Sequence, residues 1–187
     1  MIPSSLPLVI IDKYYKNNVF AKKVLLEHSK LVAEKALEIN RSASLGMNET
    51  FLWEAAMLHD IGIVFTDAKD IGCYGELPYI CHGFKGRELL ESEGLHSYAL
   101  ICERHTGMGL SQTQIVEDKL PIPHRDMMPV SEEEKLVCFA DKFFSKSGNI
   151  NEEKGVNKIL MSLRRHDANG GERFLEMCEK YRMSVKK

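Results

Sequence analysis

Apolar residues recur at helical spacing along most of this chain. In the first long segment, from Asn17 to about Ala43, they return every three or four positions, which marks one face of a helix. This stripe consists of Phe20, Val24, Leu25, Leu31, Val32, Ala36 and Ile39. The alternation of apolar and polar residues that is typical of strands is nearly absent. The pattern therefore predicts an all-α fold.

Glycines and capping residues set the expected limits of the next helices. Asn48 opens the second helix, and we expect Gly62 to end it. Residues 63–81 contain several glycine and proline residues and predict irregular structure. Two further helices are expected at about 82–93 and 96–105, each closed by a glycine.

The second half of the chain alternates between a loop and strong helix signals. Residues 107–130 predict a long surface loop, because three prolines rule out a continuous helix. Ser131 predicts a helix start, with Glu134 completing a capping box, and this helix is expected to reach about Ser147. The last two helices are expected at about 152–166 and 171–183.

Chain length and the absence of repeats or linkers favour a single domain. The 187 residues are enough to bury one substantial core without disulfides. We therefore expect one domain over residues 1–187, a compact helical bundle of about seven to nine helices. Its chemistry-bearing part covers about 20–147, and C-terminal helices follow at about 152–183.

Charge and cysteine content exclude several classes of protein. A net charge of −2 provides no basic field, so we expect no dedicated nucleic-acid surface. Five cysteines without a C-x-x-C pair argue against a disulfide framework and a structural zinc site. The apolar run Leu6–Ile11 is short, interrupted by proline and not preceded by basic residues, which is unlike a signal peptide or a membrane span. We expect a cytoplasmic protein.

Several histidine and aspartate residues lie within the apolar stripes, on helix faces that are expected to be buried. His28 lies four residues from both Val24 and Val32, in the middle of a buried face. His59, His105 and Asp141 occupy similar positions on later helices. A buried carboxylate without a partner costs several kcal/mol or shifts its pKa strongly. Each histidine alone is explained by a hydrogen bond in the core, but the set together is explained by a bound cation.

The order of these residues resembles a known family. His28, then His59-Asp60-Ile61-Gly62, then His82, His105 and Asp141 follow the order H…HD…H…H…D on successive helices. This pattern is similar to that of the HD superfamily of metal-dependent phosphohydrolases. The resemblance covers about residues 20–147 and implies a helical bundle of the HD-domain type.

The resemblance implies a role for each residue of the pattern. His28, His59, Asp60 and Asp141 would bind one divalent ion, with Asp60 able to bridge to another. His82 and His105 match the two extra histidines of the dinuclear branch. Nitrogen and oxygen ligands without thiolate suit Fe, Mn, Co, Ni, Zn or Mg, and leave open whether one or two ions bind. His59 and Asp60 would thus form the centre of catalysis.

One of these assignments has a competitor. His96 is a rival ligand to His82, and His82 itself could contact phosphate from the start of its helix. We favour His82 as the ligand because His82-Gly-Phe-Lys-Gly opens a helix at the expected distance after the HD pair.

Two cations are candidates for binding the phosphate of a substrate. Lys85 lies one turn after His82 on the same helical face. Arg125 lies in the proline-rich loop, whose ends return toward His105 and Asp141. The alternative for both cations is a solvated surface charge, and for Arg125 an ion pair with Asp126 or with a glutamate from Glu132 to Glu134.

The pattern favours hydrolysis of a phosphate ester or anhydride in a small molecule, with a nucleotide as the leading candidate. Dinucleoside polyphosphates and nucleoside monophosphates are the first options. Cyclic nucleotides rank lower, because the GYP motif of the cyclic-dinucleotide branch is absent. Two alternatives are a non-catalytic HD module that binds metal or nucleotide, and a di-iron oxygenase of the HD type.

Overall fold

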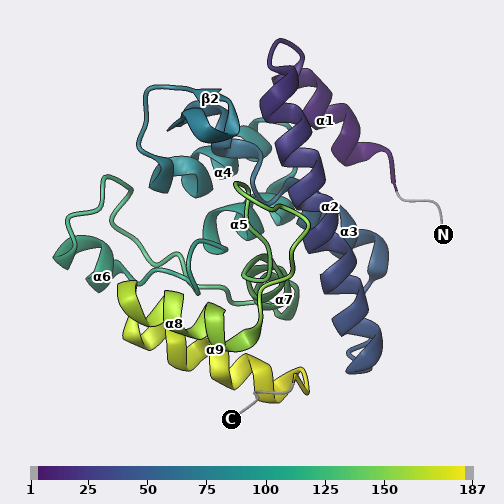
Figure 1. The fold of residues 1–187 in the computed structure, drawn as a ribbon. Helices are drawn as coiled ribbons and strands as arrows, with labels where there is room; N and C mark the ends of the chain where they lie inside the picture. Colours follow the sequence, from purple (N-terminus) through teal and green to yellow (C-terminus); the bar gives the residue numbers. More distant parts are fainter. Residues whose placement is uncertain (1–3, 184–187) are drawn as a thin grey trace.

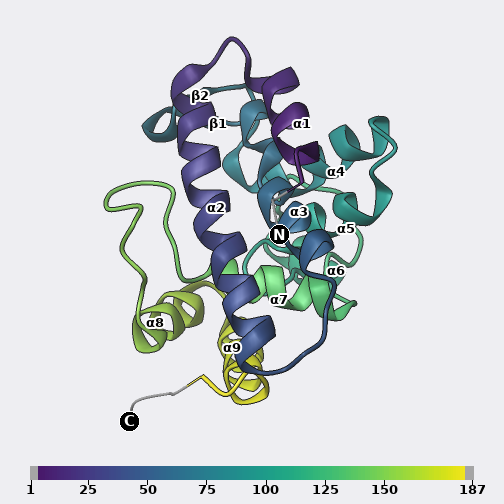
Figure 2. The same ribbon diagram turned by 90° about the vertical axis from the view of Figure 1, so that its right-hand side faces the viewer.

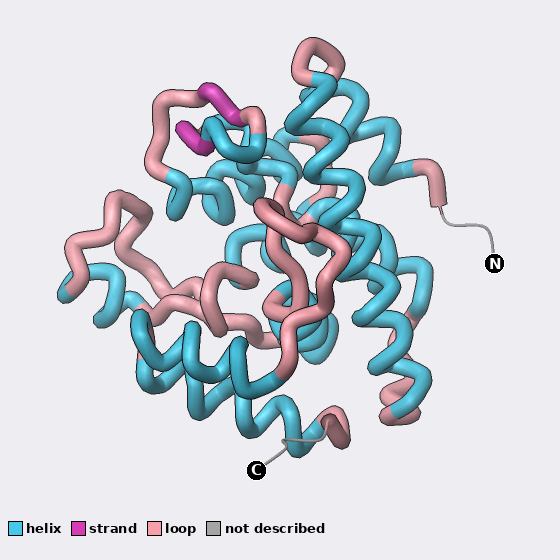
Figure 3. The backbone as a smooth tube through the Cα atoms, in the orientation of Figure 1, coloured by secondary structure: helices cyan, strands magenta, loops and turns pink. Residues whose placement is uncertain are grey.

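The computed structural model describes residues 4–183 and confirms the all-α prediction (Figures 1 and 3). Within this range the only strands are β1 (Asp67–Ala68) and β2 (Cys73–Tyr74), which pair antiparallel. None of the described helices is long and apolar enough to cross a membrane. The helices are α1 (Leu6–Tyr15), α2 (Val19–Ser42), α3 (Glu49–Leu58), α4 (His82–Ser92), α5 (His96–Arg104), α6 (Gln112–Glu117), α7 (Glu132–Asp141), α8 (Val156–His166) and α9 (Ala168–Lys180). Three short 3₁₀-helices lie between α3 and α4: η1 (Ile61–Phe65), η2 (Lys69–Ile71) and η3 (Tyr79–Cys81).

Helix α2 is the longest element, and α1, α3 and α7 pack beside it (Figures 1 and 2). The Asn18 side chain accepts a hydrogen bond from the Ala21 amide at 3.1 Å and caps its start. Its buried face contacts α1, α3 and α7. The predicted apolar stripe therefore places α2 against α3, which leads to His59 and Asp60, and against α7, which carries Asp141.

Helix α3 ends at Leu58, earlier than the expected stop at Gly62. Gly62 instead lies inside η1, where the chain passes very close to α4. A Cβ atom at Gly62 would lie 2.1 Å from the His82 carbonyl oxygen and 2.4 Å from the Gly86 amide nitrogen. The glycine thus serves a close backbone approach, which brings the HD pair next to the start of α4.

Helix α7 begins as predicted but ends sooner. The Ser131 hydroxyl caps it by accepting from the Glu134 amide at 3.1 Å, while Glu134 Oε2 accepts from the Val130 amide at 2.6 Å. The capping box is therefore displaced by one residue. The helix ends at Asp141 and not at about Ser147, and an irregular segment leads from there to α8 (Figure 3).

The proline-rich segment is less irregular than expected. Residues 107–130 include the short helix α6, whose first turn is capped by the Ser111 side chain accepting from the Gln114 amide. The prolines all lie after this helix, so they do not interrupt it. The absence of a continuous helix is confirmed, but the predicted loop contains one short helix.

Helices α8 and α9 form a pair that closes one side of the molecule (Figures 1 and 2). Phe174 stacks on Phe139 of α7 with ring centroids 4.9 Å apart, and Tyr181 meets the same ring at 5.2 Å. The larger of two hydrophobic clusters in the described residues runs from Ile10 to Tyr181, and the smaller one lies around Ile115 of α6. The C-terminal helices are therefore packed into the same core as the chemistry-bearing part.

Candidate metal centre

Five helices or helix ends deliver the predicted His and Asp side chains to one buried place. His28 comes from the middle of α2, and the HD pair follows the last turn of α3. His82 is the first residue of α4, His105 follows α5, and Asp141 is the last residue of α7. All six are buried, and we call them the His/Asp cluster: His28, His59, Asp60, His82, His105 and Asp141.

The first half of the cluster gathers four residues. His28 Nε2 lies 2.9 Å from Asp141 Oδ1 and 3.2 Å from Asp60 Oδ2. His59 Nε2 lies 3.0 Å from the same Asp60 oxygen and 3.4 Å from Asp141 Oδ1. Two imidazole nitrogens and two carboxylate oxygens thus converge within 4.8 Å of one another.

The second half uses the other oxygen of Asp60. Asp60 Oδ1 lies 3.2 Å from His105 Nε2 and 3.5 Å from His82 Nε2. The two histidine Nε2 atoms are 3.1 Å apart. Asp60 therefore presents one oxygen to each half of the cluster, which is the arrangement of a carboxylate that bridges two cations.

Backbone carbonyls set the ring orientation of three histidines. His59, His82 and His105 each have Nδ1 2.6 to 2.7 Å from the carbonyl oxygen three residues earlier. Because a carbonyl only accepts, Nδ1 is the donor in each ring, and Nε2 carries the lone pair whenever the ring is neutral. This is the usual support for a histidine that ligates a metal through Nε2.

The cluster contains buried acceptor atoms that make no hydrogen bond. Among the described residues, His59 Nε2 and both Asp60 oxygens are buried without a hydrogen bond, although Asp60 Oδ2 has an ion-pair partner in Lys146 Nζ at 2.7 Å. The lone pairs of His82 and His105 also face each other at 3.1 Å, which is repulsive without a positive charge between them. Unpaired buried acceptors of this kind fit a divalent cation in each half.

The histidines of the cluster have very different pKa values, because their charged neighbours differ. Burial opposes protonation of His59, but Asp60 and Asp141 overcome it and raise its pKa to about 9. For His82, burial and the neighbouring His105 lower the pKa to about 3. Burial also opposes ionisation of Asp60, yet His59 and Lys146 hold the pKa of that carboxyl well below its usual range. Without a cation, a proton at His59 partly replaces the missing positive charge.

Lys146 is a member of the site that the sequence reasoning missed. Its Nζ lies 2.7 Å from Asp60 Oδ2 and 4.0 Å from Asp141 Oδ1. Burial opposes its charge, but Asp60 raises the pKa of Lys146 well above its ordinary value. Lys146 therefore places a permanent ammonium group at the edge of the first half of the cluster.

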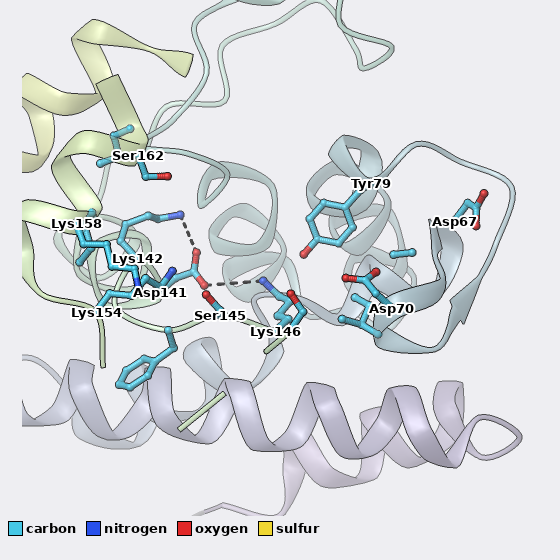
Figure 4. Close-up of a pocket in the computed structure, with 16 residues that line it drawn as sticks. Asp67, Asp70, Tyr79, Asp141, Lys142, Ser145, Lys146, Lys154, Lys158 and Ser162 are labelled. Carbon is cyan, nitrogen blue, oxygen red and sulfur yellow. Dashed lines mark hydrogen bonds and ion pairs between the residues drawn. The ribbon is translucent and has the colours of Figure 1, made fainter. Parts of the chain in front are cut away.

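A cavity of about 650 Å³ opens beside the cluster (Figure 4). Asp141 and Lys146 belong to its wall, so it reaches the first half of the cluster directly. Figure 4 shows Lys142, Lys154, Lys158 and Ser162 on one side, and Tyr79, Asp67 and Asp70 on the other. A polar ligand in this cavity would lie between a cationic wall and an acidic one.

The other predicted residues lie elsewhere. His96 is exposed at the start of α5, so the structure brings His82 and not His96 into the cluster. Lys85 forms an ion pair with Glu88 and lies 5.7 Å from the ring centroids of Phe65 and Phe84. Neither Lys85 nor Arg125 lines the cavity beside the cluster.

Arg125 has a different partner from those considered for it. Its guanidinium donates to Glu103 at 2.5 and 3.0 Å, not to its sequence neighbours. Glu103 is buried and also accepts from Arg87 at 2.5 Å. The structure therefore places Arg125 in an ion-pair network that fixes the proline-rich segment to α5.

The fold and the cluster define a class, and a family comparison agrees. The model of the HD domain matches residues 25–145, which is more than half of the chain. The chain belongs to the HD domain family, as the resemblance predicted. All six residues of the His/Asp cluster lie inside the matched range.

Individual relatives are similar over most of this chain. An uncharacterized protein of Methanocaldococcus jannaschii is 30% identical over 139 residues, covering 72% of this chain and 75% of the relative. Two tRNA (cytidine(56)-2'-O)-methyltransferases also match. The one from Thermoplasma volcanium is 29% identical, and the one from Picrophilus torridus is 27% identical. These matches cover 72% and 74% of this chain but span only 35% and 36% of the methyltransferases.

Proposed function

We propose that this protein is a metal-dependent phosphohydrolase that cleaves a phosphate ester or anhydride bond in a small molecule, with nucleotides as the first candidates. The observation that carries this proposal is a two-part His/Asp cluster, bridged by Asp60, that opens into a lysine-lined cavity. Divalent ions bound in the cluster would activate water and offset the charge that develops on phosphoryl oxygens.

The protein's own groups support such a reaction in three ways. Asp60 holds the two halves of the cluster at a fixed separation, since each of its oxygens faces one half. Carbonyl bonds to Nδ1 lock the imidazoles of His59 and His105 with Nε2 inward. Lys146 directs its ammonium to the boundary with the cavity, where it can donate to a phosphoryl oxygen.

Two other functions use the same cluster. A non-catalytic module would bind metal or nucleotide without turnover, and a di-iron oxygenase would consume oxygen. The cationic wall of the cavity favours an anionic ligand, which argues against the oxygenase. A complete set of six His and Asp side chains favours a catalytic site over a non-catalytic module, which would be expected to have lost ligands. The names of two relatives add tRNA as a further phosphodiester worth testing, although the net charge of −2 does not favour a nucleic-acid surface.

The test combines elemental analysis with phosphate release. The purified protein, loaded with each of Mn, Fe, Co, Ni, Zn and Mg, is incubated with mononucleotides, dinucleoside polyphosphates, cyclic nucleotides and tRNA. We expect metal-dependent product formation from at least one nucleotide and no oxygen uptake. Binding without turnover for every metal would favour the non-catalytic module, and oxygen uptake without hydrolysis would favour the oxygenase.

A further inference from the structure

Four lysines line the cavity, but they fall into two groups. Lys142 and Lys146 are already paired, with Nζ 2.7 Å from Asp141 and from Asp60 respectively. Lys154 and Lys158 have no ion-pair partner among residues 4–183. The cationic wall thus holds two ammonium groups that form no ion pair with the described residues.

This lack of a partner is unusual for a lysine that is partly buried. Lys35, which is 6% exposed, is paired with Glu153 at 2.7 Å and with Glu38 at 3.1 Å. Lys154 is half-buried, and burial together with the nearby ammonium groups lowers its pKa. A cationic group in such surroundings gains most from an anion that enters from outside.

The surrounding groups have the chemistry of an anion subsite. Lys158 lies in the first turn of α8, and Ser162 follows one turn later on the same face. Both line the cavity with Lys154, on the side away from Asp67 and Asp70 (Figure 4). Ammonium and hydroxyl donors at this spacing suit the several oxygens of a phosphoryl group.

We propose that Lys154 and Lys158 bind a second anionic group of the substrate, separate from the phosphoryl group that reacts at the His/Asp cluster. The preferred substrates are then small molecules with at least two phosphoryl groups, such as a nucleoside polyphosphate or a dinucleoside polyphosphate. This inference rests on the proposed function, which places the first phosphoryl group at the cluster. Lys154 and Lys158 lie outside the family-matched residues 25–145, so this subsite belongs to the C-terminal part of the chain.

Isothermal titration tests the subsite without requiring turnover. Inorganic orthophosphate and pyrophosphate are titrated into the metal-loaded protein, and elemental analysis after each titration checks that metal is retained. We expect pyrophosphate to bind the wild type at least about tenfold more tightly than orthophosphate. In the double variant Lys154→Ala/Lys158→Ala this preference should fall by about tenfold, and arginine at both positions should largely restore it.

Controls make each outcome decisive. Lys30→Ala removes an equally charged but exposed lysine of α2 and should keep the wild-type preference. Lys158→Ala alone, at an exposed position, gives a second variant whose folding is not in question. An unchanged preference in the double variant overturns the proposal, as does an equal loss of affinity for both ions, which would place the lysines on the reacting phosphoryl group. If the preference depends on the lysines but no substrate is hydrolysed, the hydrolase assignment fails while the subsite stands.

Discussion

The His/Asp cluster and the lysine wall meet at Asp141, yet they are built in opposite ways. The cluster is buried, is contributed by α2, α3, α4, α5 and α7, and lies within the family-matched residues. The wall at Lys154 and Lys158 is partly exposed and comes from the segment before α8 and its first turn. The protein thus combines a buried, rigid cluster with a partly exposed lysine wall, which we call the flank of the site.

Burial explains this difference. Inside the core each polar atom needs a partner, so the histidine rings are fixed by carbonyl bonds and tolerate little displacement. At the flank, water satisfies an ammonium group that has no ligand, so side chains there can change with less cost. We therefore expect the catalytic step to depend on the cluster, and substrate specificity to depend on the flank.

The largest effect is expected from Asp60→Ala, which removes the carboxylate shared by both halves. Metal content should fall below about one tenth of the wild-type value and kcat by at least about a thousandfold. Helical content should stay near wild type, because the truncated side chain contacts other ligands and not the apolar core. Elemental analysis measures the metal content, steady-state kinetics measure kcat, and circular dichroism measures the helical content, with the exposed Asp118→Ala as control. Unchanged metal stoichiometry would refute the assignment of Asp60.

His82→Ala or His105→Ala should break only the second half of the cluster. Each should lower the metal content from two ions toward one per chain, since His28, His59 and Asp141 still serve the first half. The matched control is His96→Ala, which removes an exposed histidine. If both variants keep the wild-type stoichiometry, the second half does not hold an ion.

Lys146 lies where the two regions meet, and its loss should strengthen metal binding but weaken catalysis. Lys146→Met removes a positive charge 2.7 Å from Asp60, so a divalent ion should bind about tenfold more tightly. The same change should lower kcat/KM by about tenfold or more, because the phosphoryl group loses a donor. Titration with metal and steady-state kinetics separate the two effects, with Lys30→Met as control. Weaker metal binding would contradict this role.

The sequence predicted the cluster but not Lys146, for a reason that lies in α7. The apolar stripes and the order of histidines placed six side chains on the right helices. If the helix continued to Ser147 as predicted, Lys146 would point away from Asp141. Five residues of α-helix rotate a side chain by about 500°, which is about 140° past a full turn. The actual end at Asp141 turns the chain back toward Asp60. A periodic pattern predicts helix ends less reliably than any other feature. Here the end of α7 determines whether Lys146 reaches the site.

Helix α6 and Gly62 show two further limits of the sequence pattern. Ser111 and Gln114 have the spacing of a capping box, so the start of α6 was detectable within the loop. Gly62 gave no such signal, because a stop and a close approach both favour glycine. The lysine wall was also unpredictable, because Lys154 and Lys158 reach the cavity only through the pairing of α8 with α9 and the contact of Phe174 of α9 with Phe139 of α7.

Acid–base behaviour should distinguish the metal-free cluster from the metal-bound one. The pKa of His59 rises from 6.5 to about 9 without metal, so its proton stabilises the metal-free fold. That stabilisation is complete below about pH 6.5 and is lost as the pH rises through about 9. A metal must displace this proton, so its affinity should rise by up to about tenfold per pH unit across the same range.

Thermal unfolding and metal titration at pH 6.5, 7.5 and 9 measure both sides of this linkage. The metal-free protein should lose a few degrees of Tm toward pH 9, while the metal-bound protein should not. A metal affinity that does not change with pH would show that His59 carries no proton to displace.

The smallest effect is expected at Arg125, which tests whether the flank extends to the proline-rich segment. The buried Glu103 keeps its bond to Arg87 at 2.5 Å when Arg125 is removed. Because the Arg125 side chain is 45% exposed, Arg125→Ala should lower the free energy of unfolding by no more than about 1 kcal/mol. Its kcat/KM should stay within about twofold of wild type, while Arg87→Ala, which removes the more buried partner, should destabilise more. A tenfold loss of kcat/KM in Arg125→Ala at full metal content would instead assign it the phosphate contact that the sequence suggested, and would require its pair with Glu103 to open during the reaction.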